Sequence, residues 1–127
     1  MKKIVVFGAT GNIGAYFVDY CKSRIDEQKY QIIAVGRKKT DFFQKAGIEY
    51  INVDVCRDSD FQCLPTEDLY AVVNLAGILP AYLKNYDPFK YVETNICGAL
   101  RILEYARRNN ADRALYTQTW SVQGGYW

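Results

Sequence analysis

The sequence contains no histidine, and that absence excludes several kinds of enzyme site. Hydrolysis by a Ser-His-Asp triad, a nucleophilic Cys-His pair and zinc binding through imidazole all need a histidine side chain. The four cysteines, Cys21, Cys56, Cys63 and Cys97, form no C-x-x-C pair, which argues against a metal or redox motif. We therefore expect no metal site and four reduced, mostly buried thiols.

A strong charge of one sign and long apolar runs are lacking as well. The 127 residues carry a formal net charge of +2 without a long basic run, which argues against a nucleic-acid-binding surface. The first apolar run, residues 4–7, is too short for a signal peptide, and no stretch approaches the length of a membrane span. We expect one cytoplasmic domain that binds neither nucleic acid nor membrane.

Strand-like and helix-like segments alternate along the whole sequence. The pattern predicts strands over residues 3–7, 31–35, 48–53, 69–75 and 113–117. It predicts helices over residues 12–29, 40–45 and 88–108, with at most two helical turns over 58–64. This alternation is typical of an α/β, Rossmann-like, doubly wound parallel sheet, for which we expect the strand order 3-2-1-4-5 and a ligand over the carboxyl ends of the strands.

The most informative motif is a glycine-rich turn between the first strand and the first helix. Gly8, Gly11 and Gly14 are spaced three residues apart there. Such glycines let the backbone come close to a pyrophosphate, which the N–H groups at the helix N-terminus then bind. A tight turn without a ligand is the alternative, but the strand before it and the helix after it favour dinucleotide binding.

The end of the second predicted strand carries information on which dinucleotide is bound. An acidic residue there would accept a hydrogen bond from the ribose 2′-hydroxyl of NAD. The sequence has Arg37-Lys38-Lys39 instead, so three cations are available for the 2′-phosphate of NADP. The cofactor is therefore expected to be NAD(P), with NADP favoured, although a solvated basic turn is the alternative.

Five short motifs follow one another in order along the chain. They are Thr10-Gly11-Asn12-Ile13-Gly14 with Gly8 before it, Asp54-Val55, Asn74-Leu75-Ala76-Gly77, Asn95 followed by Gly98 and Leu103-Glu104-Tyr105-Ala106, and Leu115-Tyr116-Thr117-Gln118-Thr119-Trp120-Ser121. In these motifs the chain resembles the N-terminal part of the extended short-chain dehydrogenases/reductases, the NAD(P)-dependent sugar-nucleotide epimerase/dehydratase family. Each motif taken singly is a weak signal, and Asp54, Asn95 and Thr119 each have an ordinary structural alternative.

The resemblance implies a set of site residues. The cofactor-binding positions are Gly8, Thr10, Gly11, Asn12, Ile13, Gly14, Arg37, Asp54, Val55, Leu75, Ala76, Gly77, Asn95 and Thr117. The catalytic hydroxyl would be Thr119 by register, with Ser121 and Thr117 as alternatives, because the run around Thr119 departs from the family's serine-rich pattern. The family's catalytic Tyr-x-x-x-Lys pair is expected after the fifth strand and is absent from this sequence. Tyr86 and Lys90 have that spacing, but Pro88 lies between them and Tyr86 precedes the helix, so we exclude them.

The helix predicted over residues 88–108 has the clearest boundaries. Asp87 is its expected N-cap and Pro88 its first residue. Its apolar stripe consists of Phe89, Val92, Ile96, Leu100 and Leu103. The resemblance implies a homodimer through this helix, whereas the stripe could equally belong to the core.

Two functions remain open from the sequence. In the first, residues 1–127 are the N-terminal, dinucleotide-binding portion of a Rossmann domain, truncated after its fifth strand, from an epimerase, dehydratase or reductase that acts on a sugar nucleotide. That portion would be inactive alone, since it lacks the tyrosine, the lysine and a substrate-binding segment. In the second, the chain is a stand-alone, non-catalytic NADP(H)-binding sensor or structural module.

Overall fold

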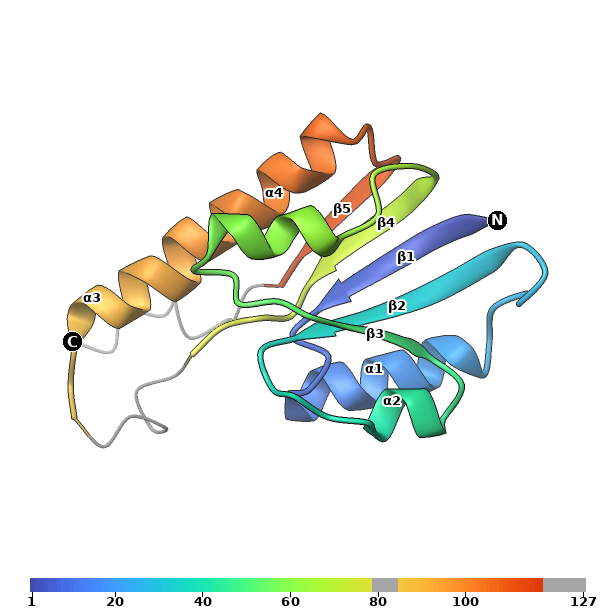
Figure 1. Cartoon of the computed structure of the whole chain (residues 1–127), viewed down its shortest axis with the longest axis horizontal. Coiled ribbons are helices and arrows are strands. Elements are labelled where there is room, and N and C mark those ends of the chain that lie inside the picture. The colour runs from blue at the N-terminus through green and yellow to red at the C-terminus, as the bar shows by residue number, and fades with distance from the viewer. Residues whose placement is uncertain (79–84, 118–127) are drawn as a thin grey trace.

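The structure is a computed structural model, and it describes residues 1–78 and 85–117. Its strands are β1 (Lys2–Phe7), β2 (Tyr30–Gly36), β3 (Glu49–Asn52), β4 (Leu69–Asn74) and β5 (Arg113–Tyr116). Its helices are α1 (Asn12–Lys22), α2 (Phe42–Lys45), the 3-10 helix η1 (Asp58–Cys63), α3 (Pro88–Tyr91), the π-helical segment η3 (Val92–Gly98) and α4 (Ala99–Arg108). The strands form one parallel sheet in the order β3-β2-β1-β4-β5, so the predicted fold class and strand order are confirmed (Figure 1).

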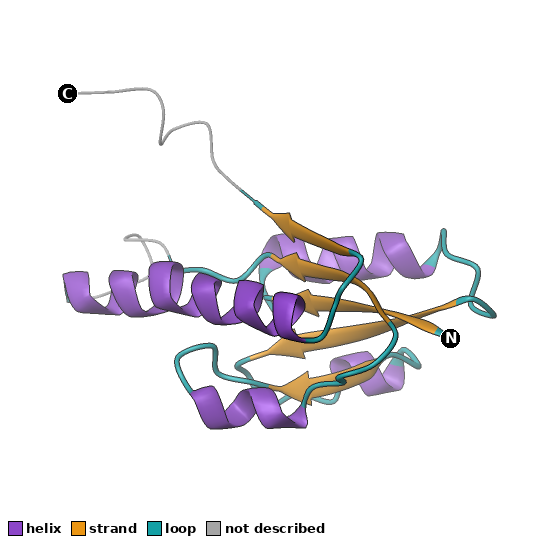
Figure 2. Cartoon of the chain, turned by 90° about the horizontal axis from the view of Figure 1, so that it is seen from above, coloured by secondary structure: helices purple, strands orange, loops and turns teal. Residues whose placement is uncertain are grey.

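The sheet has a separate apolar core on each face, as a doubly wound sheet requires. Alternate residues of β1 point to opposite faces, so that Val5 belongs to one core and Val6 to the other. The core around Val5 is closed by η1 and α4, and the core around Val6 by α1 and α2. Figure 2 shows the strands between these two groups of helices. Both cores hold β1 in place, and the glycine turn follows directly from its end.

Helix α1 is shorter than predicted. It ends at Lys22 rather than at residue 29, and Ser23 closes it by donating a hydrogen bond from its hydroxyl to the Tyr20 carbonyl, 2.8 Å away. Asp26 then accepts from the Gln28 amide at 3.0 Å, which forms a local turn that competes with helix. In the first turn of α1, Ile13 is 73% exposed, although it would lie on one apolar stripe with Phe17 and Cys21 in a regular helix.

The predicted helix over residues 88–108 is observed as α3, η3 and α4 in direct succession. Asp87 caps it as expected, because its carboxylate accepts from the Phe89 amide at 3.1 Å. The alternative that its large apolar residues are core is wrong. Ala99, Ile102, Tyr105 and Ala106 face the sheet instead. The stripe is exposed: Phe89 is 80% exposed, Val92 46%, Ile96 62%, Leu100 60% and Leu103 41%.

Tyr105 anchors the inner side of α4. Its ring contacts Phe7 and Phe61 edge-on, with centroid distances of 6.0 and 6.2 Å. Its hydroxyl donates a hydrogen bond to the Pro65 carbonyl at 2.6 Å, and burial raises the pKa of this phenol. Among the helices in residues 1–78 and 85–117, none combines the length and apolar character needed to cross a membrane.

Candidate functional site

A cavity of about 480 Å³ lies at the carboxyl ends of the strands, where ligands bind in open α/β sheets. It is bounded by the turns that follow β1, β2, β3 and β4. Ten of the predicted cofactor residues line it: Gly8, Thr10, Gly11, Asn12, Arg37, Asp54, Val55, Leu75, Ala76 and Gly77. Four do not: Ile13, Gly14, Asn95 and Thr117. The structure therefore separates residues that can touch a ligand from residues that shape the walls.

The three glycines of the first turn have different roles. Gly8 has a φ of +77°, and a Cβ there would lie 2.5 Å from the Ala76 nitrogen. A Cβ at Gly14 would overlap the Gly8 carbonyl, so both positions are required by the turn itself. Gly11 has an ordinary backbone conformation, and a Cβ there would lie 3.3 Å from the Gly8 oxygen. Gly11 lines the cavity, and its position is therefore the one most directly available for close approach of a ligand.

The N-terminus of α1 is open toward an anion. Gly11 caps it without a side-chain hydrogen bond, and the first turn contains no acidic residue. Backbone N–H groups in the first turn of a helix lack intrahelical partners and carry the positive end of the helix dipole. Because Gly11 and Asn12 also line the cavity, this end of the cavity can hold a phosphate group.

Asp54 and Val55 form the wall that follows β3. One Asp54 carboxylate oxygen caps its own turn by accepting from the Cys56 amide at 2.9 Å. Asp54 therefore caps the turn, as the structural alternative expected, and also lines the cavity. Val55 is held from behind by Gly98, where a Cβ would come within 2.7 Å of the valine methyl group. Arg101 adds a 3.4 Å hydrogen bond to the Val55 carbonyl.

Asn95 holds the wall that follows β4. Its side-chain amide donates to the Ile78 carbonyl and accepts from the Ile78 N–H, both at 2.9 Å. Thr117 donates from its hydroxyl to the Asn74 carbonyl at 3.1 Å, and Asn74 accepts from the Ala76 amide at 2.9 Å. Asn95 and Thr117 therefore act on the loop and do not line the cavity. Buried Asn74 was not predicted as a site residue, although a polar side chain at the end of an apolar strand was a usable signal.

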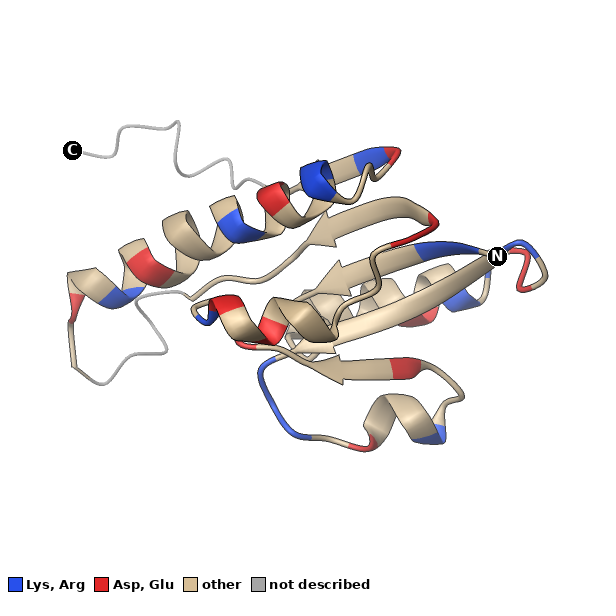
Figure 3. Ribbon diagram, turned by 45° about the horizontal axis from the view of Figure 1, so that its top comes forward, with Lys and Arg blue, Asp and Glu red and all other residues tan. Residues whose placement is uncertain are grey.

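The basic turn after β2 borders the same cavity. Arg37 and Lys38 line it, Lys39 does not, and all three side chains are exposed. In the part of the chain that the structure describes, none of the three forms an ion pair. Figure 3 shows the turn as a continuous basic run ahead of α2. Lys38, which the sequence analysis named only as part of the basic run, lines the cavity as well. Ile78 and Thr94 also line it and were not predicted, since neither belongs to a recognised motif.

The catalytic candidates remain expectations. Thr119 and the alternative Ser121 lie outside the described residues. Tyr86, of the excluded pair, precedes α3 and is 79% exposed. Within residues 1–78 and 85–117, no three acidic or cysteine side chains gather closely enough to hold a metal ion.

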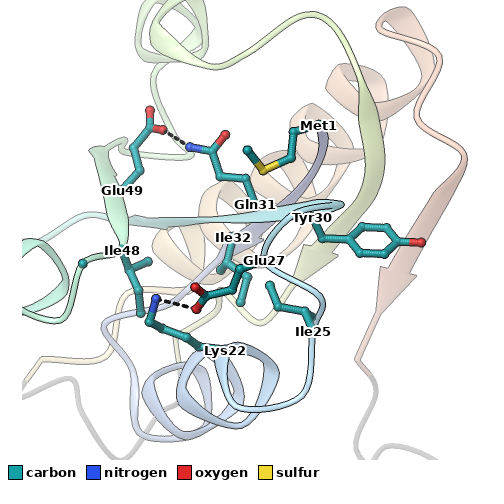
Figure 4. A pocket seen from close by; sticks show the side chains of 10 residues that line it. Met1, Lys22, Ile25, Glu27, Tyr30, Gln31, Ile32, Ile48 and Glu49 are labelled. Carbon is teal, nitrogen blue, oxygen red and sulfur yellow. Dashed lines mark hydrogen bonds and ion pairs between the residues drawn. The ribbon is translucent and has the colours of Figure 1, made fainter.

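A second hollow, of about 270 Å³, lies at the opposite, amino-terminal edge of the sheet (Figure 4). Four of its polar side chains are paired with one another. Lys22 meets Glu27 at 3.0 Å, and Gln31 donates to Glu49 at 2.6 Å. Because these groups already satisfy each other, the glycine-turn cavity is the stronger candidate for a ligand site.

Comparison with known proteins identifies the family of the chain. The model of the NAD dependent epimerase/dehydratase family matches residues 4–126. UDP-glucuronic acid decarboxylase 1 of Arabidopsis thaliana is 33% identical over 129 residues, which cover 96% of this chain and 27% of that protein. An uncharacterized protein of Methanocaldococcus jannaschii is 24% identical over 135 residues, which cover 98% of this chain and 41% of that protein. The chain thus spans well under half the length of these relatives.

Solved structures share the fold. The ADP-L-glycero-D-manno-heptose-6-epimerase of Helicobacter pylori superposes with a TM-score of 0.80 at 18% identity, over 99% of this chain and 42% of that one. The UDP-glucose 4-epimerase of Thermus thermophilus, solved with NAD, gives a TM-score of 0.75 at 18% identity, over 92% of this chain and 37% of that one. At such low identity these likenesses establish the fold alone.

Proposed function

Because this chain belongs to the NAD dependent epimerase/dehydratase family, we propose that it is the nucleotide-binding half of an NAD(P)-dependent epimerase, dehydratase or reductase that acts on a sugar nucleotide. The observation that carries the proposal is the glycine turn, which joins a doubly buried strand to an open helix N-terminus at the edge of the 480 Å³ cavity. The sugar-nucleotide part rests on relatives named for UDP-linked sugars.

The residues present fit a dinucleotide. The N-terminus of α1 at Gly11 and Asn12 would hold the pyrophosphate, and Asp54 with Val55 would contact the adenine. Arg37, which lines the cavity, would bind a 2′-phosphate. A bound nicotinamide would supply the hydride acceptor and donor, while the protein orients it and excludes water. The Asn95 amide holds the Ile78 backbone, and with it the wall that follows β4.

Tested as it stands, the 127-residue chain would bind cofactor and turn over no substrate. The sequence holds no tyrosine and lysine at the family's catalytic spacing apart from the excluded Tyr86 and Lys90. The alternative, a non-catalytic NADP(H)-binding module, is favoured by the basic turn and gives the same lack of turnover. The two differ in stability, because a self-sufficient module should melt cooperatively and gain stability when NADP(H) is added.

Paired titrations with NAD⁺ and NADP⁺ test both the binding and its selectivity. We expect NADP⁺ to bind more tightly and Arg37→Asp to weaken NADP⁺ binding about tenfold or more, because a charge-assisted phosphate contact contributes roughly 1.5–3 kcal/mol. Lys39→Asp is the matched control, since it makes the same charge change in the same turn outside the cavity. Calorimetry would measure both constants. Tighter binding of NAD⁺, or no effect of Arg37→Asp, would contradict the 2′-phosphate assignment.

We also propose that the exposed apolar stripe of α3, η3 and α4 forms a homodimer. Five large apolar side chains are exposed on one helix face, and a contiguous exposed apolar patch often marks a protein–protein contact. Ile96→Glu together with Leu100→Glu should shift the chain toward monomer, because two charges would then be buried at the contact. Sedimentation velocity would measure the mass. Phe42→Glu is the control, since Phe42 is 61% exposed on another helix. An unchanged mass in the double variant, or equal effects of both changes, would argue against this interface.

A further inference from the structure

The backbone of the basic turn after β2 is fastened to β3 by two side chains. Asn52 donates from its side-chain amide to the Gly36 carbonyl at 3.0 Å and to the Arg37 carbonyl at 2.8 Å. Tyr50 donates from its hydroxyl to the Lys38 carbonyl. The carbonyl groups of residues 36, 37 and 38 therefore all accept hydrogen bonds from two alternate residues of β3. Neither Tyr50 nor Asn52 belongs to a motif of the sequence.

Tyr50 is itself held firmly in this arrangement. Its ring stacks on Phe43, with centroids 5.3 Å apart and an interplanar angle of 12°. Burial raises the pKa of the Tyr50 phenol, so the hydroxyl keeps the proton that it donates at neutral pH. At Gly36 a Cβ would lie 2.9 Å from the Tyr50 hydroxyl and 2.8 Å from a Thr10 methyl group. The fastening thus reaches from β3 to the glycine turn.

These contacts bear directly on the choice of dinucleotide. A free carbonyl oxygen in this turn could accept a hydrogen bond from a ribose 2′-hydroxyl, and it would repel a 2′-phosphate. Because the carbonyls of residues 36–38 accept hydrogen bonds from β3 side chains, they point toward β3, while the cations Arg37 and Lys38 line the cavity. An anion bound there would contact positive side chains on a backbone that is already ordered. This preorganisation reduces the entropic cost of binding.

We propose that Asn52 and Tyr50 are positioning residues for 2′-phosphate recognition, and that they confer selectivity for NADP over NAD by holding the carbonyls of residues 36–38 away from the ligand. The inference rests on the proposed function, since it needs a dinucleotide in the cavity. Neither side chain touches the ligand in this account. They act by fixing the backbone conformation of Arg37 and Lys38.

The test compares the ratio of the dissociation constants for NAD⁺ and NADP⁺ in the 127-residue chain and its variants. Asn52→Ala and Tyr50→Phe should each lower this ratio about tenfold, mainly by weakening NADP⁺ binding, as expected when a charged phosphate contact loses its geometry. Both side chains have matched controls elsewhere in the fold. Asn109 also donates to a backbone carbonyl, that of Tyr105 at 2.8 Å, and Tyr105 donates its hydroxyl to Pro65 at 2.6 Å.

Asn109→Ala and Tyr105→Phe should therefore lower stability in urea without changing the ratio. If Asn52→Ala and Tyr50→Phe leave the ratio at the wild-type value, or the controls lower it equally, the positioning role is overturned while dinucleotide binding stands. Wild-type binding of both cofactors without preference also overturns it. Failure of the wild-type chain to bind either cofactor would instead contradict the proposed function.

Discussion

Replacing Gly14 with alanine should abolish dinucleotide binding and destabilise the fold by ~3 kcal/mol, the upper part of the range for overpacking a buried site. The added Cβ would overlap the Gly8 carbonyl, and both groups belong to backbone that cannot move without opening the turn. The sign of the change in unfolding free energy distinguishes this position from an ordinary helix position. At an ordinary helix position, glycine to alanine would stabilise the protein by up to about 1 kcal/mol. Urea unfolding followed by circular dichroism measures this difference.

Gly11→Ala is the contrasting variant for the same turn. Gly11 has a φ of −74°, and its Cβ would need the Gly8 oxygen to move by only a few tenths of an ångström. We expect this variant to keep its stability to within about 1 kcal/mol while it weakens cofactor binding, because its methyl group would enter the cavity where the pyrophosphate approaches. A stable Gly14→Ala variant would show that the turn is more adaptable than its geometry indicates. Full-strength binding by Gly11→Ala would contradict the phosphate site.

The fold could be predicted from the sequence because it depends on local alternation and on a general handedness rule. Apolar runs such as residues 69–75 separate clearly from amphipathic helices, and right-handed crossovers then leave few sheet orders. The helix end at Lys22 was missed because its competing hydrogen bonds, from Ser23 and to Asp26, are local side-chain effects that an apolar period does not reveal.

The apolar pattern of the sequence did not predict which face of the helix after β4 packs on the sheet. Its most apolar stripe, with Ile96 and Leu100, is exposed, and the face with Ala99, Ile102 and Ala106 packs on the sheet. Both faces carry large apolar residues, because Ile102 and Tyr105 are buried while Ile96 and Leu100 are exposed, so the apolar period alone does not identify the face that packs on the sheet. The cavity walls were predicted where a motif marks them. The hydrogen bonds of Asn52 and Asn95 join segments 16 and 17 residues apart, and no periodicity encodes such partners.

Asn95 provides the second large effect. Its amide is matched to the Ile78 backbone as donor and acceptor at once, with both distances 2.9 Å. Asn95→Ala leaves the Ile78 N–H and carbonyl without these partners, which should cost about 2 kcal/mol of stability. It should also weaken cofactor binding about tenfold, because the wall at residues 76–78 would no longer be held in the binding conformation. A tenfold change in the dissociation constant corresponds to ~1.4 kcal/mol of binding free energy.

Asn95→Asp distinguishes this pairing from a general packing role. At neutral pH its carboxylate still accepts from the Ile78 N–H but repels the Ile78 carbonyl, so we expect a loss similar to that of alanine. When protonated, the carboxyl can donate to that carbonyl, and its pKa in the folded protein should lie above the unfolded value of about 3.9. A carboxyl group whose pKa is higher in the folded than in the unfolded protein stabilises the fold at pH values below the unfolded-state pKa. That stabilisation is lost as the pH rises through the folded-state pKa. Urea titrations at pH 7 and pH 4 should therefore show the deficit of Asn95→Asp relative to wild type shrinking in acid, and that of Asn95→Ala staying constant. Equal deficits at both pH values would exclude the paired hydrogen bonds as the reason for Asn95.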